Sequence, residues 1–135
     1  MEVTKGKFED VDIQDVVKKV HDADIDIIAN YLFGLTGDTF ESMQKTLDLS
    51  LELCMIAWNA YAVMDLPGSG LYKKAIEKGL KLPDDYAGYS LYYYNTKPLP
   101  TEQLSPAEIL KFRDQAFTTY HTHKPFLDKI RIKYG

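Results

Sequence analysis

The amino-acid sequence predicts an α/β fold in which parallel strands alternate with covering helices. Two short, nearly continuous apolar segments, residues 25–35 and 58–64, are typical of strands buried within a sheet. The segments before, between and after them carry apolar residues at helical spacing. Because a parallel strand needs a long connection over a covering helix, this alternation favours right-handed crossovers.

Residues 1–80 are expected to supply these elements in order. A first helix is expected from Val11, with Asp10 or Asp12 as its cap. The first strand ends in the turn residues 36–39, and a long helix follows whose apolar positions lie three and four residues apart: Met43, Leu47, Leu51, Cys54 and Met55. After the second strand, a short helix over residues 71–78 is expected to end at Gly79, which suits a left-handed cap.

Residues 81–135 are predicted to form a tyrosine-rich loop followed by a helical C-terminal extension. Five tyrosines crowd between residues 86 and 94, in a segment that is interrupted by glycine and followed by prolines, so it is expected to be loop-like, with one strand as an alternative. Ser105, Pro106 and Glu108 are typical of a helix start. Two strands cannot close a sheet, so further strands are expected either beyond Leu80 or in a larger α/β layer.

Composition narrows the classes of partner and compartment. The 135 residues suit one core, and 16 basic against 20 acidic residues lack the positive field that drives nucleic-acid binding. The most apolar stretch, residues 47–63, is interrupted by polar side chains, which argues against a membrane span. A single cysteine and the lack of an apolar leader after Met1 favour a cytoplasmic location.

No catalytic or metal-ligating residue is predicted. His121 and His123 have no acidic or thiol ligand beside them, so a helix terminus explains them better. The acidic residues within 22–26 imitate the start of a calcium loop, but the required glycine and final acid are missing. Cys54 lies among apolar residues and is interpreted as a core residue.

Two glycine-bearing turns are stronger candidates for a ligand site. Residues 34–39 and 65–72 each follow an expected strand at its carboxyl end, where α/β sheets bind ligands. In the first turn, glycines allow close backbone approach, and the next helix offers free amide donors to an anion or a polar ligand. Each turn taken alone is also explained as an ordinary turn with a helix cap.

Taken in order, these segments resemble the later part of a radical S-adenosylmethionine enzyme barrel, in its cobalamin-binding-type branch. Residues 33–39 (FGLTGDT) are similar to the family segment fGLPGET, and residues 67–72 (PGSGLY) with Gly79 are similar to PGTxLY…G. The tail motif PTxxLSxxEvLrFRDxAF is matched within residues 94–117. The resemblance covers nearly the whole chain.

The resemblance implies a partial (β/α)6 barrel in which S-adenosylmethionine, bound at a 4Fe-4S cluster, is cleaved to a deoxyadenosyl radical. Cobalamin is a further cofactor of this branch. The three-cysteine motif C-x-x-x-C-x-x-C is missing from this chain, and one cysteine cannot ligate such a cluster. We therefore expect a C-terminal barrel fragment that has no resident cofactor and is not catalytic alone, while a retained half-site for S-adenosylmethionine is left open. Lys5 and Gly6 resemble the family's KG before its fifth strand.

The family's fifth-strand motif contacts the adenosyl group mainly through backbone and apolar groups. By resemblance these cofactor contacts fall on Asn30, Leu32 and Gly34, and on Gly37 and Asp38 in the turn that follows. The match departs from the family where Asn30 stands for glycine, Asp38 for glutamate and residue 36 for proline. Contacts of the last strand map near residues 61–63.

Two functional hypotheses follow. In the first, the chain is an inactive remnant of a radical Fe-S oxidoreductase or methyltransferase. In the second, it is a stand-alone module for protein interaction or small-ligand binding that self-associates. In both cases an unpaired sheet edge acts as a template for pairing, so we expect a homo-oligomer.

Overall fold

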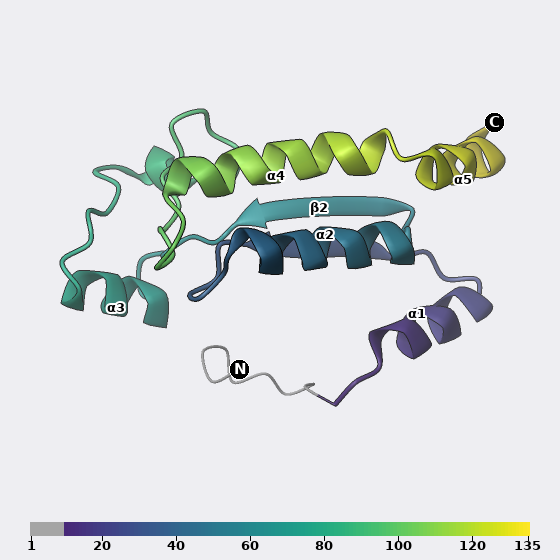
Figure 1. Cartoon of the computed structure of the whole chain (residues 1–135), viewed down its shortest axis with the longest axis horizontal. Helices are drawn as coiled ribbons and strands as arrows, with labels where there is room; N and C mark the ends of the chain where they lie inside the picture. Colours follow the sequence, from purple (N-terminus) through teal and green to yellow (C-terminus); the bar gives the residue numbers. More distant parts are fainter. Residues whose placement is uncertain (1–9) are drawn as a thin grey trace.

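The computed structural model describes residues 10–135 and consists, over this range, of a two-stranded sheet and five α-helices (Figure 1). The α/β class is thereby confirmed. In chain order the elements are α1 (Ile13–Asp22), β1 (Ile28–Phe33), α2 (Phe40–Leu53), β2 (Ala57–Ala62), α3 (Gly70–Glu77), the 3-10 turn η1 (Tyr86–Tyr89), α4 (Pro106–His121) and α5 (Lys124–Tyr134). The family-like Lys5 and Gly6 lie outside the described residues.

The two strands pair in parallel, as the alternation of helix and strand predicts. The register runs from Ile28 opposite Ala57 to Phe33 opposite Ala62, and α2 makes the connection. Both strands are shorter than their apolar segments. Within residues 10–135 no third strand forms, and the tyrosine segment contains the turn η1 instead of a strand. Asp85 stabilises this turn by accepting a hydrogen bond from the Gly88 amide at 3.0 Å.

The sheet is buried on one face only, which corrects the expectation of fully buried strands. Phe33, Trp58 and Ala62 belong to the core, and the aromatic rings of α4 pack against Phe33 and Trp58. Exposed and covered positions alternate along β1, so Ile28, Asn30 and Leu32 share the open face. Figure 1 shows α2 and α4 lying along the sheet.

Helix starts agree with the capping residues in the sequence. Reciprocal capping boxes begin α2 at Thr39 and Ser42, and α4 at Ser105 and Glu108. The end of α2 differs from expectation, because Cys54 adopts a left-handed φ of 47° and ends the helix before Met55. Cys54 is nevertheless a core residue, as predicted. Between residues 10 and 135, no helix combines the length and apolar character that a membrane crossing requires.

The C-terminal extension contributes to the same core as the strands. Tyr120 of α4 stacks on Trp58 of β2, with ring centroids 5.1 Å apart, and α5 adds Phe126 beside it. Ile109 and Ala116 are buried in the same cluster. Residues 1–80 and residues 81–135 therefore contribute side chains to a single core.

Candidate ligand site at the carboxyl end of the sheet

Parallel pairing brings the two glycine-bearing turns to the same end of the sheet, where both strands have their carboxyl ends. The Val63 amide donates to the Phe33 carbonyl at 2.9 Å, so pairing continues to the point where both strands end. The turn of residues 34–39 and the segment from Asp65 to α3 both leave from this edge. In parallel sheets this is the edge where ligands bind.

Gly34 is required by packing against α4. Its φ of +86° lies in the left-handed region, and a Cβ at this position would lie 2.9 Å from both Cδ1 and Cγ2 of buried Ile109. Gly37 has a similar φ of +90°, but a Cβ there would meet open space. Close approach of α4 to the backbone therefore explains Gly34 without a ligand.

Asp38 organises the turn from within. Its carboxylate accepts hydrogen bonds from the amides of Gly34 at 3.0 Å and Leu35 at 2.9 Å, and from the Ser42 hydroxyl at 2.8 Å. The Thr101 hydroxyl donates to the Asp38 carbonyl at 3.0 Å. The two amides that follow β1 thus already have an anionic partner in Asp38, rather than being free for a bound anion.

Asn30 and Leu32 lie apart from these turn residues, on the open face of the sheet. The Asn59 side-chain amide donates to the Asn30 side-chain oxygen at 3.2 Å. Leu32 is 49% exposed and is paired in register with Tyr61, whose ring meets Tyr92 edge-on at 5.9 Å. The five predicted contacts therefore form two groups, one on the open face and one inside the turn.

Asp65 is the first residue of the second candidate turn, and its side chain was not singled out from the sequence. It is 1% exposed, and within residues 10–135 neither carboxylate oxygen has a hydrogen-bond partner. Burial raises the pKa of its carboxyl above the ordinary range of an aspartate. The sequence holds a signal for this burial, because the acid directly follows the apolar run that ends in Met64.

The donor atoms do not fit a three-cysteine iron–sulfur cluster. Because α2 returns from the carboxyl end of β1 to the amino end of β2, Cys54 lies at the edge of the sheet opposite the glycine turns. The Lys129 ammonium donates to its carbonyl. Within residues 10–135, no group of three or more histidine, cysteine, aspartate or glutamate side chains could hold a metal ion.

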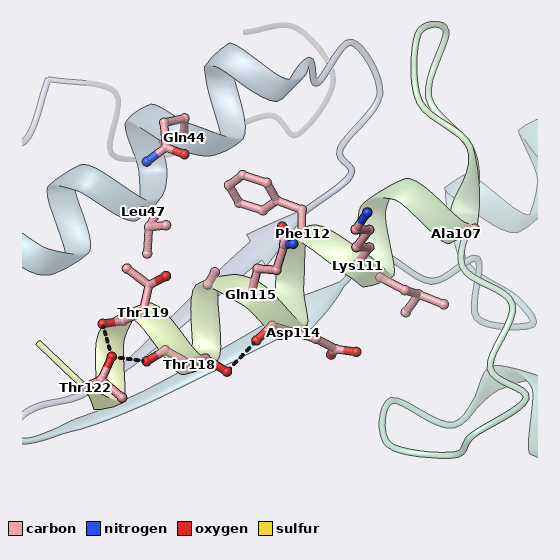
Figure 2. Close-up of a pocket in the computed structure, with 12 residues that line it drawn as sticks. Gln44, Leu47, Ala107, Lys111, Phe112, Asp114, Gln115, Thr118, Thr119 and Thr122 are labelled. Atoms are coloured by element: carbon pink, nitrogen blue, oxygen red, sulfur yellow. Dashed lines mark hydrogen bonds between the residues drawn. The ribbon is translucent and has the colours of Figure 1, made fainter.

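A groove of about 950 Å³ lies along α4, on the helical side of the molecule (Figure 2). Its lining includes Gln44 and Leu47 from α2 and a row of polar residues from α4. The Thr118 and Thr122 hydroxyls that border it donate to carbonyls of their own helix. Gln44 likewise donates to Asp48 of its own helix, and Asp114 pairs with Arg113, so these polar groups are engaged within α2 and α4.

Comparison with models of protein families, with curated proteins and with solved structures finds no match for this chain.

Proposed function

We propose that this chain is the C-terminal, sheet-completing part of a radical S-adenosylmethionine-type barrel. In this proposal it carries half of an S-adenosylmethionine-binding surface and is not catalytic by itself. The single observation that carries the proposal is the open face of a parallel β–α–β unit whose other face is covered by helices. In (β/α) barrels the helices lie outside and the opposite face of each strand points inward.

The chemistry of the open face supports a nucleoside ligand. The Asn30 and Asn59 side chains lie side by side in register and supply amide donors and acceptors to polar atoms of a ligand. One position further along the same face, Leu32 and Tyr61 offer an apolar surface next to them. The family cofactor, when bound at its cluster, supplies a radical, and no step of that chemistry is assigned to these residues.

Binding of S-adenosylmethionine by the purified chain tests this proposal. We expect weak, saturable binding in calorimetry, and we expect the Asn30→Ala, Leu32→Ala double variant to weaken it about tenfold. Ile132→Ala is the matched control, because this α5 side chain is 86% exposed and lies away from the sheet's open face. Gly34 is unsuitable for this test since its substitution disturbs packing on α4.

Two results would contradict the proposal. A titration without saturation at millimolar ligand, or equal binding by the double variant, would remove the half-site. Anaerobic reconstitution with iron and sulfide that yields a stable cluster and deoxyadenosine would show that the chain is catalytic alone.

A second candidate function, self-association through the sheet edge, rests on the backbone of β1. The Phe33 carbonyl accepts from Val63 and so points toward β2. Main-chain groups alternate along a strand, and those of Ile28, Asn30 and Leu32 therefore point to the outer edge. Between Ile28 and Phe33 there is no charge and no proline, the features that usually block an edge from pairing.

Light scattering over a range of concentrations tests this candidate. We expect the unmodified chain to form dimers or larger assemblies, and we expect Leu32→Lys to shift it toward the monomer by placing a charge at the edge. Tyr94→Lys is the matched control, because Tyr94 is 96% exposed in the tyrosine segment. A monomer at high concentration would reject self-association, whereas sensitivity to the Tyr94 variant alone would assign the contact to the tyrosines.

A further inference from the structure

Asp65 is a buried carboxylate that neither candidate function uses. It follows β2 by three residues and is 1% exposed, and neither of its oxygens has a hydrogen-bond partner in the part of the chain that the structure describes. An ionised carboxylate in such surroundings loses its hydration without gaining a compensating partner. The folded arrangement therefore favours the protonated form of this side chain.

The tyrosine-rich segment contacts the chain immediately before Asp65. The Leu99 amide donates to the Val63 carbonyl at 3.3 Å, and the Thr96 hydroxyl contacts the Met64 sulfur at 3.9 Å. These contacts fix the segment to the two residues that immediately precede Asp65. Thr96 also binds the Gly88 carbonyl, which links the far part of the segment to η1.

Tyr89 of η1 is an ionisable neighbour of Asp65. Burial, and then the charges of Asp65 and of Tyr72 in α3, raise the pKa of the Tyr89 phenol. Burial is the largest influence on the pKa of the Asp65 carboxyl, and it raises that pKa.

The charged groups of the segment and of α4 are engaged elsewhere. Lys97 lies 3.9 Å from Asp84, and Arg113 pairs with Asp114 while donating to the Leu91 carbonyl at 3.2 Å. Asp85 caps η1 through the Gly88 amide.

We propose that Asp65 is the proton-binding group of a latch: when protonated it keeps the tyrosine-rich segment, residues 86–99, docked on the carboxyl end of β2, and when ionised it releases that segment. Release lets water reach the carboxylate and exposes the carboxyl end of β2. The latch thus couples pH to access at this edge, independently of which ligand binds there.

The direction of the pH effect follows from linkage. In the released state the carboxyl returns toward its ordinary pKa, whereas docking raises that pKa. Docking is therefore fully favoured below the ordinary aspartate range, and it weakens as pH rises through the raised value.

Hydrogen exchange of the whole chain from about pH 4 to about pH 8, corrected for intrinsic exchange rates, tests the latch. Protection of residues 86–99 is expected to fall at least about threefold more over this range than protection of α4. Asp65→Asn is expected to keep protection high throughout. Glu77→Gln is the matched control, since this exposed carboxylate of α3 lies outside residues 86–99 and the variant should follow the unmodified chain.

Protection of residues 86–99 that does not change with pH, or a pH dependence that persists in Asp65→Asn, would overturn the latch. Should that variant fail to fold, NMR titration of the Asp65 carboxyl carbon in the unmodified chain decides the question. A midpoint at the ordinary aspartate value would refute the proposal, and a raised midpoint that coincides with exchange broadening in residues 86–99 would support it.

Discussion

Tyr120 is a polar side chain whose position inside the core depends on one hydrogen bond. Its hydroxyl donates to the Met55 carbonyl at 2.6 Å, while its ring stacks on Trp58. Burial strongly raises the pKa of the phenol, so the hydroxyl stays neutral and keeps its proton for this bond. The residue thereby joins α4 to the chain between α2 and β2.

We expect Tyr120→Phe to lower the free energy of unfolding by about 1–3 kcal/mol, because it leaves the buried Met55 carbonyl without its partner. Urea denaturation followed by far-UV circular dichroism measures this loss. Tyr94→Phe, at an exposed position, should be neutral. Equal stability of the Tyr120 variant and the unmodified chain would show that the bond contributes nothing net.

Gly34 and Gly37 provide a matched pair, because both have a left-handed backbone but only a Cβ at Gly34 would collide with another side chain. Alanine at Gly37 should cost about 1–2 kcal/mol from the left-handed backbone alone. Alanine at Gly34 should cost about 1–3 kcal/mol more, because its Cβ meets Ile109. Thermal melts of the two variants compare these costs, and equal losses would contradict the packing explanation.

Among the elements, α1 is helical without being packed. Its sequence has the expected apolar spacing, yet none of its residues is buried, and Gln14 contacts Glu52 of α2 through an exposed hydrogen bond at 2.8 Å. Helices of this length owe most of their stability to tertiary packing. The exposed apolar residues of α1 and the unpaired edge of β1 both come from the N-terminal part of the sequence.

We expect Val16→Ala in α1 to change the free energy of unfolding by less than about 0.5 kcal/mol. Leu47→Ala, in the buried row of α2, should cost about 2–5 kcal/mol. Chemical denaturation of both variants measures the difference. A large loss for Val16→Ala would mean that α1 is packed in solution, for example against another copy of the chain.

At the scale of the whole molecule, residues 1–80 and 81–135 differ in the pattern of their sequences, but both contribute to a single hydrophobic core. Phe33, Trp58 and Met43 from the first part pack with Ile109 and Tyr120 from the second. Two strands and their connecting helix have too little buried surface of their own to form a stable unit.

A chain truncated after residue 80 should therefore show no cooperative thermal transition, and its circular dichroism should be that of a largely unfolded peptide. Calorimetry of the truncated and full-length chains makes the comparison. A cooperative melt of residues 1–80 alone would show that the core is separable at this boundary.

Much of the secondary structure could be predicted from the sequence, because its signals act over a few residues. Thr39 with Ser42, and Ser105 with Glu108, cap their helices across three residues, and the crossover helix between two apolar strands predicts their parallel pairing. Asn30 and Leu32 were predicted as binding residues and do lie on an accessible face, while their role stays a prediction.

What only the tertiary structure decided is burial, because it depends on segments far apart in the chain. The apolar residues of β1 suggested a strand covered on both sides, yet the described chain covers one side. Asp65 was predicted only as the first residue of a turn, and the structure shows that its side chain is buried and that Thr96, some thirty residues later, contacts the preceding Met64. Local hydrogen bonds can be inferred from neighbours in sequence, whereas desolvation requires knowing which distant segment excludes the water.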